Sequence, residues 1–406
     1  MAGAERKKYL GVNVLEATRQ RIAWAFDEFS RIYVSFSGGK DSTVMLHLVM
    51  DEAIKRKKKV GVLFVDLEGQ YKLTIEHIQE CYDLYAEYIE PFWVALPIHL
   101  RNAVSQYQPQ WICWEPDKRE SWIRNLPEMA IAEQDYFPFY HYAMEFEEFV
   151  PAFGKWYANG EPCACFVGIR TGESLNRWRT IAGHGVKWRD GDGQKNHVGY
   201  MGETLWNIYP IYDWIEKDLW KYHGITGKPY NKLYDRMYQA GLTLHQMRIC
   251  QPYGDDQRKG LWLFHIIEPE TWGKIVSRVN GANQGALYAQ EIGNILGVNT
   301  VSLPPGHTWQ SFAMMLIDTL PPIHAEHYKD KIAVFLKWYQ DKGYPGGIPD
   351  DGPLDKSAPS WKRICKAILR NDYWCKGLSF SQHKSEAYEK YTKLMKRRRQ
   401  EWKIMI

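Results

Sequence analysis

Short apolar runs alternate with amphipathic stretches along the first hundred residues. The runs are rich in β-branched and aromatic side chains, as strands are, and cover 31–36, 59–65 and 91–96. The amphipathic stretches place an apolar residue at every third or fourth position, as helices do, over 15–29, 42–57 and 71–88. Strands and helices that alternate at these lengths predict an α/β fold, with a parallel twisted sheet flanked by helices.

The pattern stops and then resumes. Residues from about 99 to 160 are irregular and rich in aromatics and proline, and we interpret them as an insertion. A buried strand is predicted over 163–169, and residues 209–224 predict a short strand and an amphipathic helix. Asp213 suits the N-cap of that helix, because Glu216 follows three residues later.

Strand patterns become rare after about residue 254, and helical spacing dominates. Residues 343–359 carry four Pro and four Gly and predict a loop. A basic helix is predicted at the end of the chain, with Lys-Arg-Arg-Arg at 396–399. We therefore expect an α/β domain over 1–250, with the insertion inside it, and a mainly helical domain over 251–406.

Composition narrows the class of protein. With 45% hydrophobic and 25% charged residues, the chain is globular. It has no apolar stretch of membrane-spanning length and no apolar core of a signal peptide near its start, so we expect a cytoplasmic protein without a membrane partner. Seven cysteines favour reduced thiols over a disulfide framework.

The bend between the first strand and the next helix carries more polar groups than a turn needs. Gly38 and Gly39 allow backbone N–H groups to turn inward without a Cβ in the way. Lys40 supplies a positive charge, and Ser37 and Ser42 can donate hydroxyl hydrogen bonds. The helix that follows adds free N–H groups and the positive end of its dipole. The bend therefore predicts a binding site for phosphate.

Asp41 has a different part in this bend, because a carboxylate repels phosphate. It is expected to hold Lys40, to cap the helix, or to take part in holding a divalent metal. The spacing G-x-x-x-x-G-K-[ST] of a Walker loop is absent, and so is the G-x-G-x-x-G of a dinucleotide site.

The Ser-Gly-Gly-Lys-Asp-Ser stretch resembles the PP-loop of the adenine nucleotide α-hydrolase-like superfamily. Three further blocks resemble the phosphoadenosine phosphosulfate (PAPS) reductases of that superfamily. They are "VLFVDLEGQYKLTIEHI" after the second strand, "FVGIRTGESLNRWR" at 166–179, and "YPIYDWIEKDLWKYHGITGKPYNKLYDRMYQAG" at 209–241. The resemblance covers about 32–241 without the insertion, and it implies ATP or PAPS as the substrate.

The resemblance also implies roles for particular residues. It places nucleotide contacts at Ser37 to Ser42, at Asp66 and Glu68 after the second strand, and at Gly168, Arg170, Glu173 and Arg179. Arg170, Arg177 and Arg179 suit a sulfate or phosphate group, which arginine binds with two parallel hydrogen bonds. Catalysis would rest on Lys40, Asp41, Arg170 and Arg177, and Mg²⁺ would be held by Asp41 and Asp66.

The chain departs from the PAPS reductases at one point. Those enzymes need a nucleophilic cysteine near the C-terminus, and this chain ends without one, since the context of Cys375 does not match. Thiol-dependent reduction of PAPS is therefore not expected. An iron–sulfur cluster is not expected either, because the cysteines that are close in sequence are Cys163 and Cys165, with one residue between them in a predicted strand. His324 and His327 form an H-x-x-H pair that we interpret as surface histidines.

A PAPS-reductase-like core without that cysteine and with a long C-terminal region is similar to the bacterial immunoglobulin-binding regulator A-like proteins (DUF3440). That likeness implies a co-activator that works with a ParB-like partner. Two hypotheses follow: an enzyme that acts at the α-phosphate or sulfuryl group of an adenine nucleotide, or a nucleotide-responsive regulator that binds DNA. The basic runs at 55–59 and 396–399 and the 18 Trp and 26 Tyr motivate the second.

Overall fold

The computed structural model of the chain describes residues 11–105, 108–182, 186–191, 193–249, 253–254, 260–282, 302–320, 322–354, 358–370 and 372–380. It divides into two compact units. The first comprises residues 1–96, 125–141 and 150–249, and the second comprises 97–124, 142–149 and 250–406. The domain boundary near residue 250 stays a prediction.

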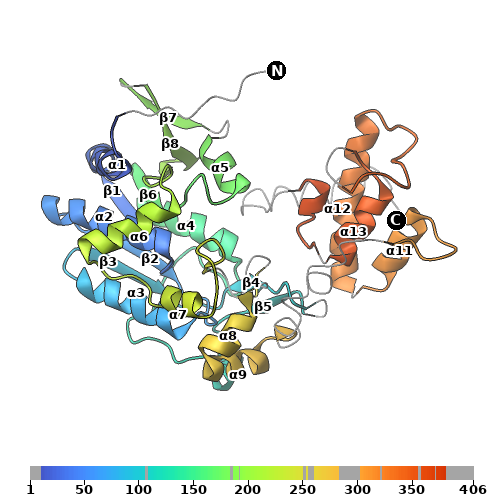
Figure 1. Cartoon of the computed structure of the whole chain (residues 1–406), viewed down its shortest axis with the longest axis horizontal. Coiled ribbons are helices and arrows are strands. Elements are labelled where there is room, and N and C mark those ends of the chain that lie inside the picture. Colours follow the sequence, from blue (N-terminus) through green and yellow to red (C-terminus); the bar gives the residue numbers. More distant parts are fainter. Residues whose placement is uncertain are drawn as a thin grey trace. The chain divides into compact units, whose positions relative to one another are not determined.

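Within the described residues, the first unit is built on a seven-stranded sheet with the order β3-β2-β1-β6-β9-β8-β7 (Figure 1). Its parallel part comprises β1 (Arg31–Ser35), β2 (Val60–Val65), β3 (Ile89–Val94), β6 (Cys163–Val167) and β9 (Leu205–Ile208). Two antiparallel strands, β8 (Gly193–Gly202) and β7 (Lys187–Asp190), extend it beyond β9. The mostly parallel sheet confirms the predicted α/β class.

The parallel strands are apolar along nearly their whole length because helices cover both faces. On one face, α1 (Val14–Glu28), α2 (Lys40–Arg56), α3 (Lys72–Leu84) and α6 (Glu216–Thr226) share a hydrophobic core with Ile32 and Val34 of β1. On the other face, α4 (Phe146–Ala158) packs Phe153 and Tyr157 against Tyr33, with ring centroids 5.3 Å from the Tyr33 ring in both cases. Two short helices, α5 (Leu175–Ala182) and α7 (Leu233–Gln239), complete the unit.

The prediction of an irregular segment over 99–160 is wrong at its end, where α4 forms. Pro151 inside α4 had weakened the helical pattern, because proline lacks the N–H that a helix interior uses. The short strand expected at the start of 209–224 is also wrong, since β9 ends at Ile208. The β7–β8 hairpin was not predicted.

The second unit is mainly helical in its described part after residue 260, as predicted. Its elements are β4 (His99–Arg101), β5 (Gln110–Ile112), η1 (Pro116–Ser121), α8 (Trp262–Ile267), α9 (Pro269–Arg278), α11 (Trp309–Asp318), α12 (Pro322–Asp341), α13 (Trp361–Leu369) and η3 (Lys376–Leu378). Helices α11, α12 and α13 lie together (Figure 1). Their buried side chains form a hydrophobic core of their own. The basic run at 396–399 lies outside the described residues. No helix in the described part combines the length and apolar character needed to span a bilayer.

Candidate functional site

The candidate site lies where two neighbouring strands of the sheet end. After β1 the chain passes through α2 to β2, and after β6 it passes through α5 toward β9. Since β2 and β9 lie on opposite sides of the β1–β6 pair, the two connections diverge between β1 and β6. In open α/β sheets this point leaves a crevice at the carboxyl ends of the strands, and ligands bind there. The loops at 36–39 and 168–174 follow the carboxyl ends of β1 and β6, which are neighbouring strands. Both loops carry residues predicted for the site, and they therefore lie at the same end of the sheet.

The loop after β1 is shaped by two glycines and two serines. Gly38 has a φ of +69°, a left-handed conformation that favours glycine, and a Cβ there would lie 3.0 Å from Thr74 and Ile78 side-chain atoms. The hydroxyl groups of Ser37 and Ser42 are 3.0 Å apart, and Ser42 Oγ also donates to the Gly39 carbonyl oxygen at 3.1 Å. These contacts close the turn and direct the chain into α2.

Most backbone amides of this loop are not satisfied by protein acceptors among the described residues. Helix α2 begins at Lys40 with Gly39 as N-cap, and no side chain caps it. Within the described part of the chain, the N–H groups of Gly38, Gly39, Asp41 and Ser42 have no hydrogen-bond partner. Free amides at the positive end of a helix are groups that bind anions, so the start of this 17-residue helix is a candidate anion site.

Lys40 is buried beside this loop and exposes 6% of its surface. Its ammonium group donates to Glu216 Oε1 at 2.5 Å, to the Met247 carbonyl at 3.1 Å and to the Leu244 carbonyl at 3.3 Å. Its backbone N–H donates to the Tyr234 hydroxyl at 2.9 Å. Lys40 thus lies at the predicted place, but protein acceptors hold its charge.

Asp41 forms an ion pair with Arg170, whose Nε donates to Asp41 Oδ1. This pair joins the loop after β1 to the loop after β6. Among the described residues, the two terminal nitrogens of the Arg170 guanidinium have no hydrogen-bond partner, although the side chain is only 7% exposed. They remain available to an anion at the same loop.

Gly168 allows the two loops to approach each other. A Cβ on this residue would lie 2.8 Å from Ser42 Cα and 2.9 Å from Ser42 N. Both are backbone atoms that cannot rotate aside. The close contact brings Arg170, two residues further on, against Asp41.

Glu173, Arg177 and Arg179 were also predicted for the site, and the structure gives none of them a contact with Asp41 like that of Arg170. Arg177 Nη1 lies 3.1 Å from Glu173 Oε2, an ion pair whose geometry falls outside a hydrogen bond. Burial raises the pKa of Glu173 above its ordinary value, against the opposite effect of Arg177. Arg179 is exposed on α5, and no contact joins it to the loop in the part of the chain that the structure describes.

Asp66 and Glu68 are fully buried after β2. Asp66 Oδ1 accepts from the Glu68 N–H at 3.0 Å, and Asp66 Oδ2 accepts from Trp93 Nε1 at 2.8 Å. Both Asp41 and Asp66 are thus engaged by protein donors. The described residues contain no group of three or more His, Cys, Asp or Glu arranged for a metal ion. Magnesium therefore stays a prediction.

Three residues that shape the loop were not predicted from the sequence. Glu216 and Tyr234 hold Lys40, and the Asn231 side-chain amide donates to the Gly38 carbonyl at 2.9 Å and to Thr74 Oγ1 at 3.0 Å. All three residues lie in the block at 209–241, which resembles the PAPS reductases. That block was therefore the signal in the sequence that could have identified them.

The predicted cap of α6 is wrong. The N-cap is Ile215, whose N–H donates to Asp218 Oδ2 at 2.8 Å. Asp213 instead forms a two-bond ion pair with Arg21, at 2.8 and 2.6 Å. Glu216 is thereby the first residue of the helix, and its carboxylate is free to reach Lys40.

The six described cysteines are free and buried. Burial raises the pKa of Cys163 and of Cys165 to about 12, and it raises the pKa of Cys375 as well. Thiols of this kind stay protonated at neutral pH and are poor nucleophiles.

The H-x-x-H pair is not at the surface, which corrects the interpretation from sequence. His324 is fully buried, and neither of its ring nitrogens has a hydrogen-bond partner among the described residues. His327 Nε2 donates to the Tyr373 carbonyl at 2.5 Å, and its ring stacks on Tyr373 with centroids 3.9 Å apart.

Opposite effects on stability are therefore expected from the two histidines. His324→Leu removes buried polar atoms without partners and should stabilise the protein by about 1–3 kcal/mol. His327→Leu removes a hydrogen bond and should destabilise it by about 1 kcal/mol. Chemical denaturation of the two variants checks this, and a loss of stability in His324→Leu would contradict it.

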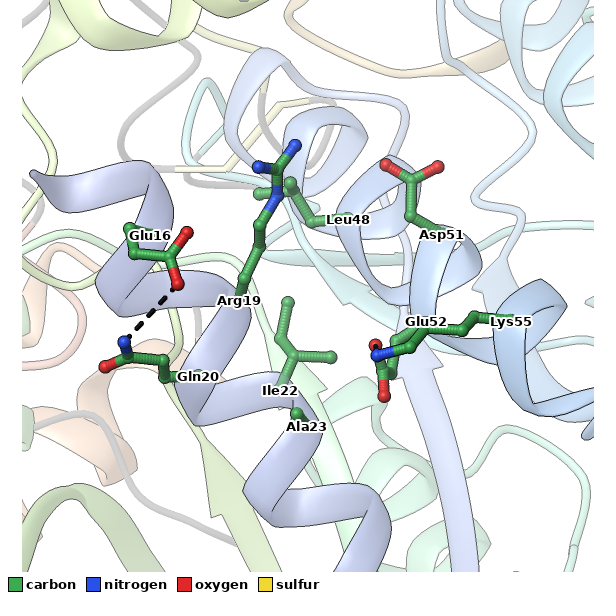
Figure 2. A pocket seen from close by; sticks show the side chains of 9 residues that line it. All are labelled: Glu16, Arg19, Gln20, Ile22, Ala23, Leu48, Asp51, Glu52 and Lys55. Atoms are coloured by element: carbon green, nitrogen blue, oxygen red, sulfur yellow. Dashed lines mark hydrogen bonds and ion pairs between the residues drawn. The ribbon is translucent and has the colours of Figure 1, made fainter.

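A groove of about 470 Å³ lies elsewhere in the first unit, between α1 and α2. Figure 2 shows that charged side chains of both signs line this groove. On α1, Gln20 donates a hydrogen bond to Glu16, and α2 contributes Asp51 and Glu52. None of the residues predicted for the site lines this groove. It is separate from the phosphate loop and lacks its free amides.

A parallel sheet whose first strand turns through Ser-Gly-Gly-Lys-Asp-Ser into a helix with open amides defines a PP-loop protein. Comparison with known families agrees. A family model described as "Phosphoadenosine phosphosulfate reductase domain" matches residues 31–240, which is more than half of the chain. The chain therefore belongs to the phosphoadenosine phosphosulfate reductase domain family, and its first unit is a nucleotide-binding domain of the PAPS-reductase-like type. The predicted superfamily and family are confirmed.

A second model, "Domain of unknown function (DUF3440)", matches residues 241–353 and 344–389. The uncharacterized protein YbdN of Escherichia coli strain K12 is 45% identical over 398 residues, which cover 98% of this chain and 97% of that protein. Similarity thus extends over both units.

Solved structures resemble the fold more distantly. A PAPS reductase from Candida auris in a phosphate complex is 14% identical, covers 54% of this chain and 83% of its own, and has a TM-score of 0.33. An FMN adenylyltransferase from Candida glabrata with FMN and the ATP analogue AMPCPP is 16% identical, covers 54% and 59%, and has a TM-score of 0.31. Likeness of this degree adds nothing to the account of the site.

Proposed function

We propose that the chain binds ATP or PAPS at the loop Ser37–Ser42 and acts at the α-phosphate or the sulfuryl group. The observation that carries this proposal is the set of free amides at the start of α2, next to the unpartnered terminal nitrogens of Arg170. Amides and a guanidinium group that converge on one point favour an anion with several oxygen atoms.

The chemistry depends on the nucleotide. With ATP, an acceptor oxygen attacks the α-phosphorus, the bond to the bridging oxygen breaks, and pyrophosphate leaves. The acceptor carries away the adenylyl group, and its proton goes to solvent. With PAPS, a thiol from another molecule attacks the sulfuryl sulfur, the bond from sulfur to the bridging phosphate oxygen breaks, adenosine 3′,5′-bisphosphate leaves, and the thiol proton goes to solvent. The thiol comes from another molecule because the described cysteines are buried and protonated.

The side chains of the site would divide this work. Arg170 and the loop amides stabilise the negative charge that builds up on the transferred group and the leaving group. Lys40 adds its charge once it leaves Glu216. Arg177 and Glu173 border the site on α5 and the loop before it, and Asp41 orients Arg170. Asp66 and Glu68 are proposed to act on the nucleotide's ribose or adenine.

Arg170→Ala is expected to weaken nucleotide binding by about 10- to 100-fold, because it removes charge-assisted hydrogen bonds and leaves the Asp41 carboxylate without its partner. Isothermal titration calorimetry with ATP, AMP, PAPS and adenosine 3′,5′-bisphosphate measures this. It also shows which nucleotide the protein prefers.

Arg179→Ala is the matched control, since Arg179 carries the same charge, follows the same strand and is exposed. Its affinity is expected to stay within about twofold of the wild type. Equal losses of nucleotide affinity in both variants would mean that arginine acts through the overall charge of the protein and not through a contact at the loop. A wild-type protein that binds none of the four nucleotides would refute the proposed function.

The regulator hypothesis remains a second proposal, with DNA and a ParB-like protein as its partners. The basic run at 55–59 gives it little support, because Arg56 pairs with Asp27 and Glu52, and Lys58 donates to the Phe29 carbonyl. A mobility-shift titration across salt concentrations tests DNA binding, since neutralised phosphates give a steep loss of affinity with salt.

A further inference from the structure

The ammonium group of Lys40 is fully occupied. It has three N–H donors, and it has three acceptors within 3.3 Å, from Glu216, Leu244 and Met247. The side chain is 7% exposed, and that of Glu216 is 10% exposed. In this arrangement the charge that a phosphate-binding loop needs is directed to protein atoms.

Two of the three acceptors come from one short stretch, residues 242–249, which we call the 242–249 segment. The same segment also contacts Glu216 and the loop that carries Arg170, and its Leu242 N–H donates to the Met237 carbonyl at 3.1 Å. His245 Nδ1 lies 2.9 Å from Glu216 Oε2, and Arg248 Nη2 donates to the Glu173 carbonyl at 3.1 Å. The segment therefore touches Lys40 at one place and the border of the Arg170 loop at another.

The attachment of the 242–249 segment depends mostly on these polar contacts. Met247 is its buried apolar anchor, with 1% exposed, whereas Leu244 is 38% exposed and the His245 side chain is 90% exposed. Segments that bury little apolar surface open at low free-energy cost. The contacts to Lys40 and Glu216 consequently account for much of what holds this segment in place.

We propose that Glu216 and the 242–249 segment form a latch on the phosphate loop, which an incoming nucleotide opens. This inference rests on the proposed function, because it concerns the same site. Phosphate oxygens replace Glu216 and the two carbonyls as acceptors of the Lys40 ammonium, and no covalent bond changes. Phosphate charge also repels the Glu216 carboxylate, so Glu216 and the 242–249 segment move away together.

A latch lowers the affinity for the ligand that must open it, because only the open state binds through Lys40. Glu216→Gln keeps the shape of the side chain and removes the charge that competes with phosphate. The variant is expected to bind ATP or PAPS about 5- to 50-fold more tightly than the wild type. Calorimetry with the full chain measures this change.

Hydrogen exchange supplies the second readout. In the wild type, ATP or PAPS should speed amide exchange in the 242–249 segment, whereas ligand binding ordinarily slows exchange near a site. In Glu216→Gln the segment should exchange faster even without nucleotide. Glu52→Gln is the control: this carboxylate pairs with Arg56 on α2 and is 13% exposed, close to the 10% of Glu216. It should alter neither readout.

Failure of the latch and failure of the proposed function give different results. If the wild type binds a nucleotide while exchange in the 242–249 segment stays the same or slows, the latch is refuted and the proposed function stands. Unchanged exchange in nucleotide-free Glu216→Gln also refutes the latch. If no nucleotide binds to the wild type or to Glu216→Gln, the proposed function fails, and the nucleotide-opened latch fails with it.

Discussion

Gly168→Val should abolish measurable nucleotide binding, with a loss of at least about 100-fold in affinity, and should destabilise the first unit by about 1–3 kcal/mol. The reason is steric: a Cβ at this position lies 2.8 Å from Ser42 Cα, and valine adds two further methyl groups. The start of α2 must then move, which displaces the open amides and separates Arg170 from Asp41. Calorimetry and thermal denaturation measure the two effects.

Gly172→Val is the matched control in the same loop. A Cβ on Gly172 meets no atom within 4 Å, and its φ lies outside the left-handed region. This variant should bind nucleotide and unfold as the wild type does. Wild-type affinity in Gly168→Val would mean that the contact between the two loops has no part in binding.

Acid is expected to destabilise the protein strongly between pH 6.5 and 4, well before most carboxylates lose their charge. Burial lowers the pKa of His77 and His324 to about 4, and it lowers the pKa of His47, His197 and His327 to about 3. In the unfolded chain these groups have an ordinary pKa of 6.5 and bind a proton below it. Within this window the unfolded state binds more protons than the folded state, so stability falls as the pH falls.

His47 shows why the folded state resists protonation. Its Nε2 donates to the Pro229 carbonyl at 2.8 Å, so Nδ1 accepts from the Tyr85 hydroxyl at 2.7 Å. A proton on Nδ1 would remove that acceptor inside a buried site. Each such histidine contributes about 1.4 kcal/mol per pH unit to the slope of stability against pH.

Urea denaturation at intervals from pH 8 to pH 4 measures this slope. His324→Leu should reduce the slope by the contribution of one histidine. A urea midpoint that stays constant from pH 6.5 to 4.5 would contradict the prediction.

Local patterns were sufficient to predict the parallel strands β1, β2, β3 and β6 and the helix that follows the Ser37–Ser42 loop, but not β7, β8 and β9. Helix α2, which follows the loop, begins two residues earlier than its apolar periodicity indicated. The reason is that Lys40 and Asp41, at its start, have no apolar side chains. Helix α4 was missed because Pro151 interrupts its pattern. The α/β class survived both errors, because the alternation of strands and helices does not depend on any one boundary.

The partners of the site residues could not be predicted, because they are distant in sequence. Glu216 lies 176 residues from Lys40, and Arg170 lies 129 residues from Asp41. Nothing local shows that Lys40 is held by a carboxylate, or that Gly168 is needed for a backbone contact instead of a turn. The resemblance placed these residues in the correct blocks, and the fold decided which of them touch.

Asn231 has a consequence for how the loop receives a ligand. Its amide group fixes the Gly38 carbonyl oxygen, and in a trans peptide the N–H of Gly39 points the opposite way. The peptide plane between the two glycines therefore cannot flip, although glycine would otherwise permit it. The backbone of the Ser37–Ser42 loop is therefore pre-organised, and ordering it costs an incoming ligand little entropy.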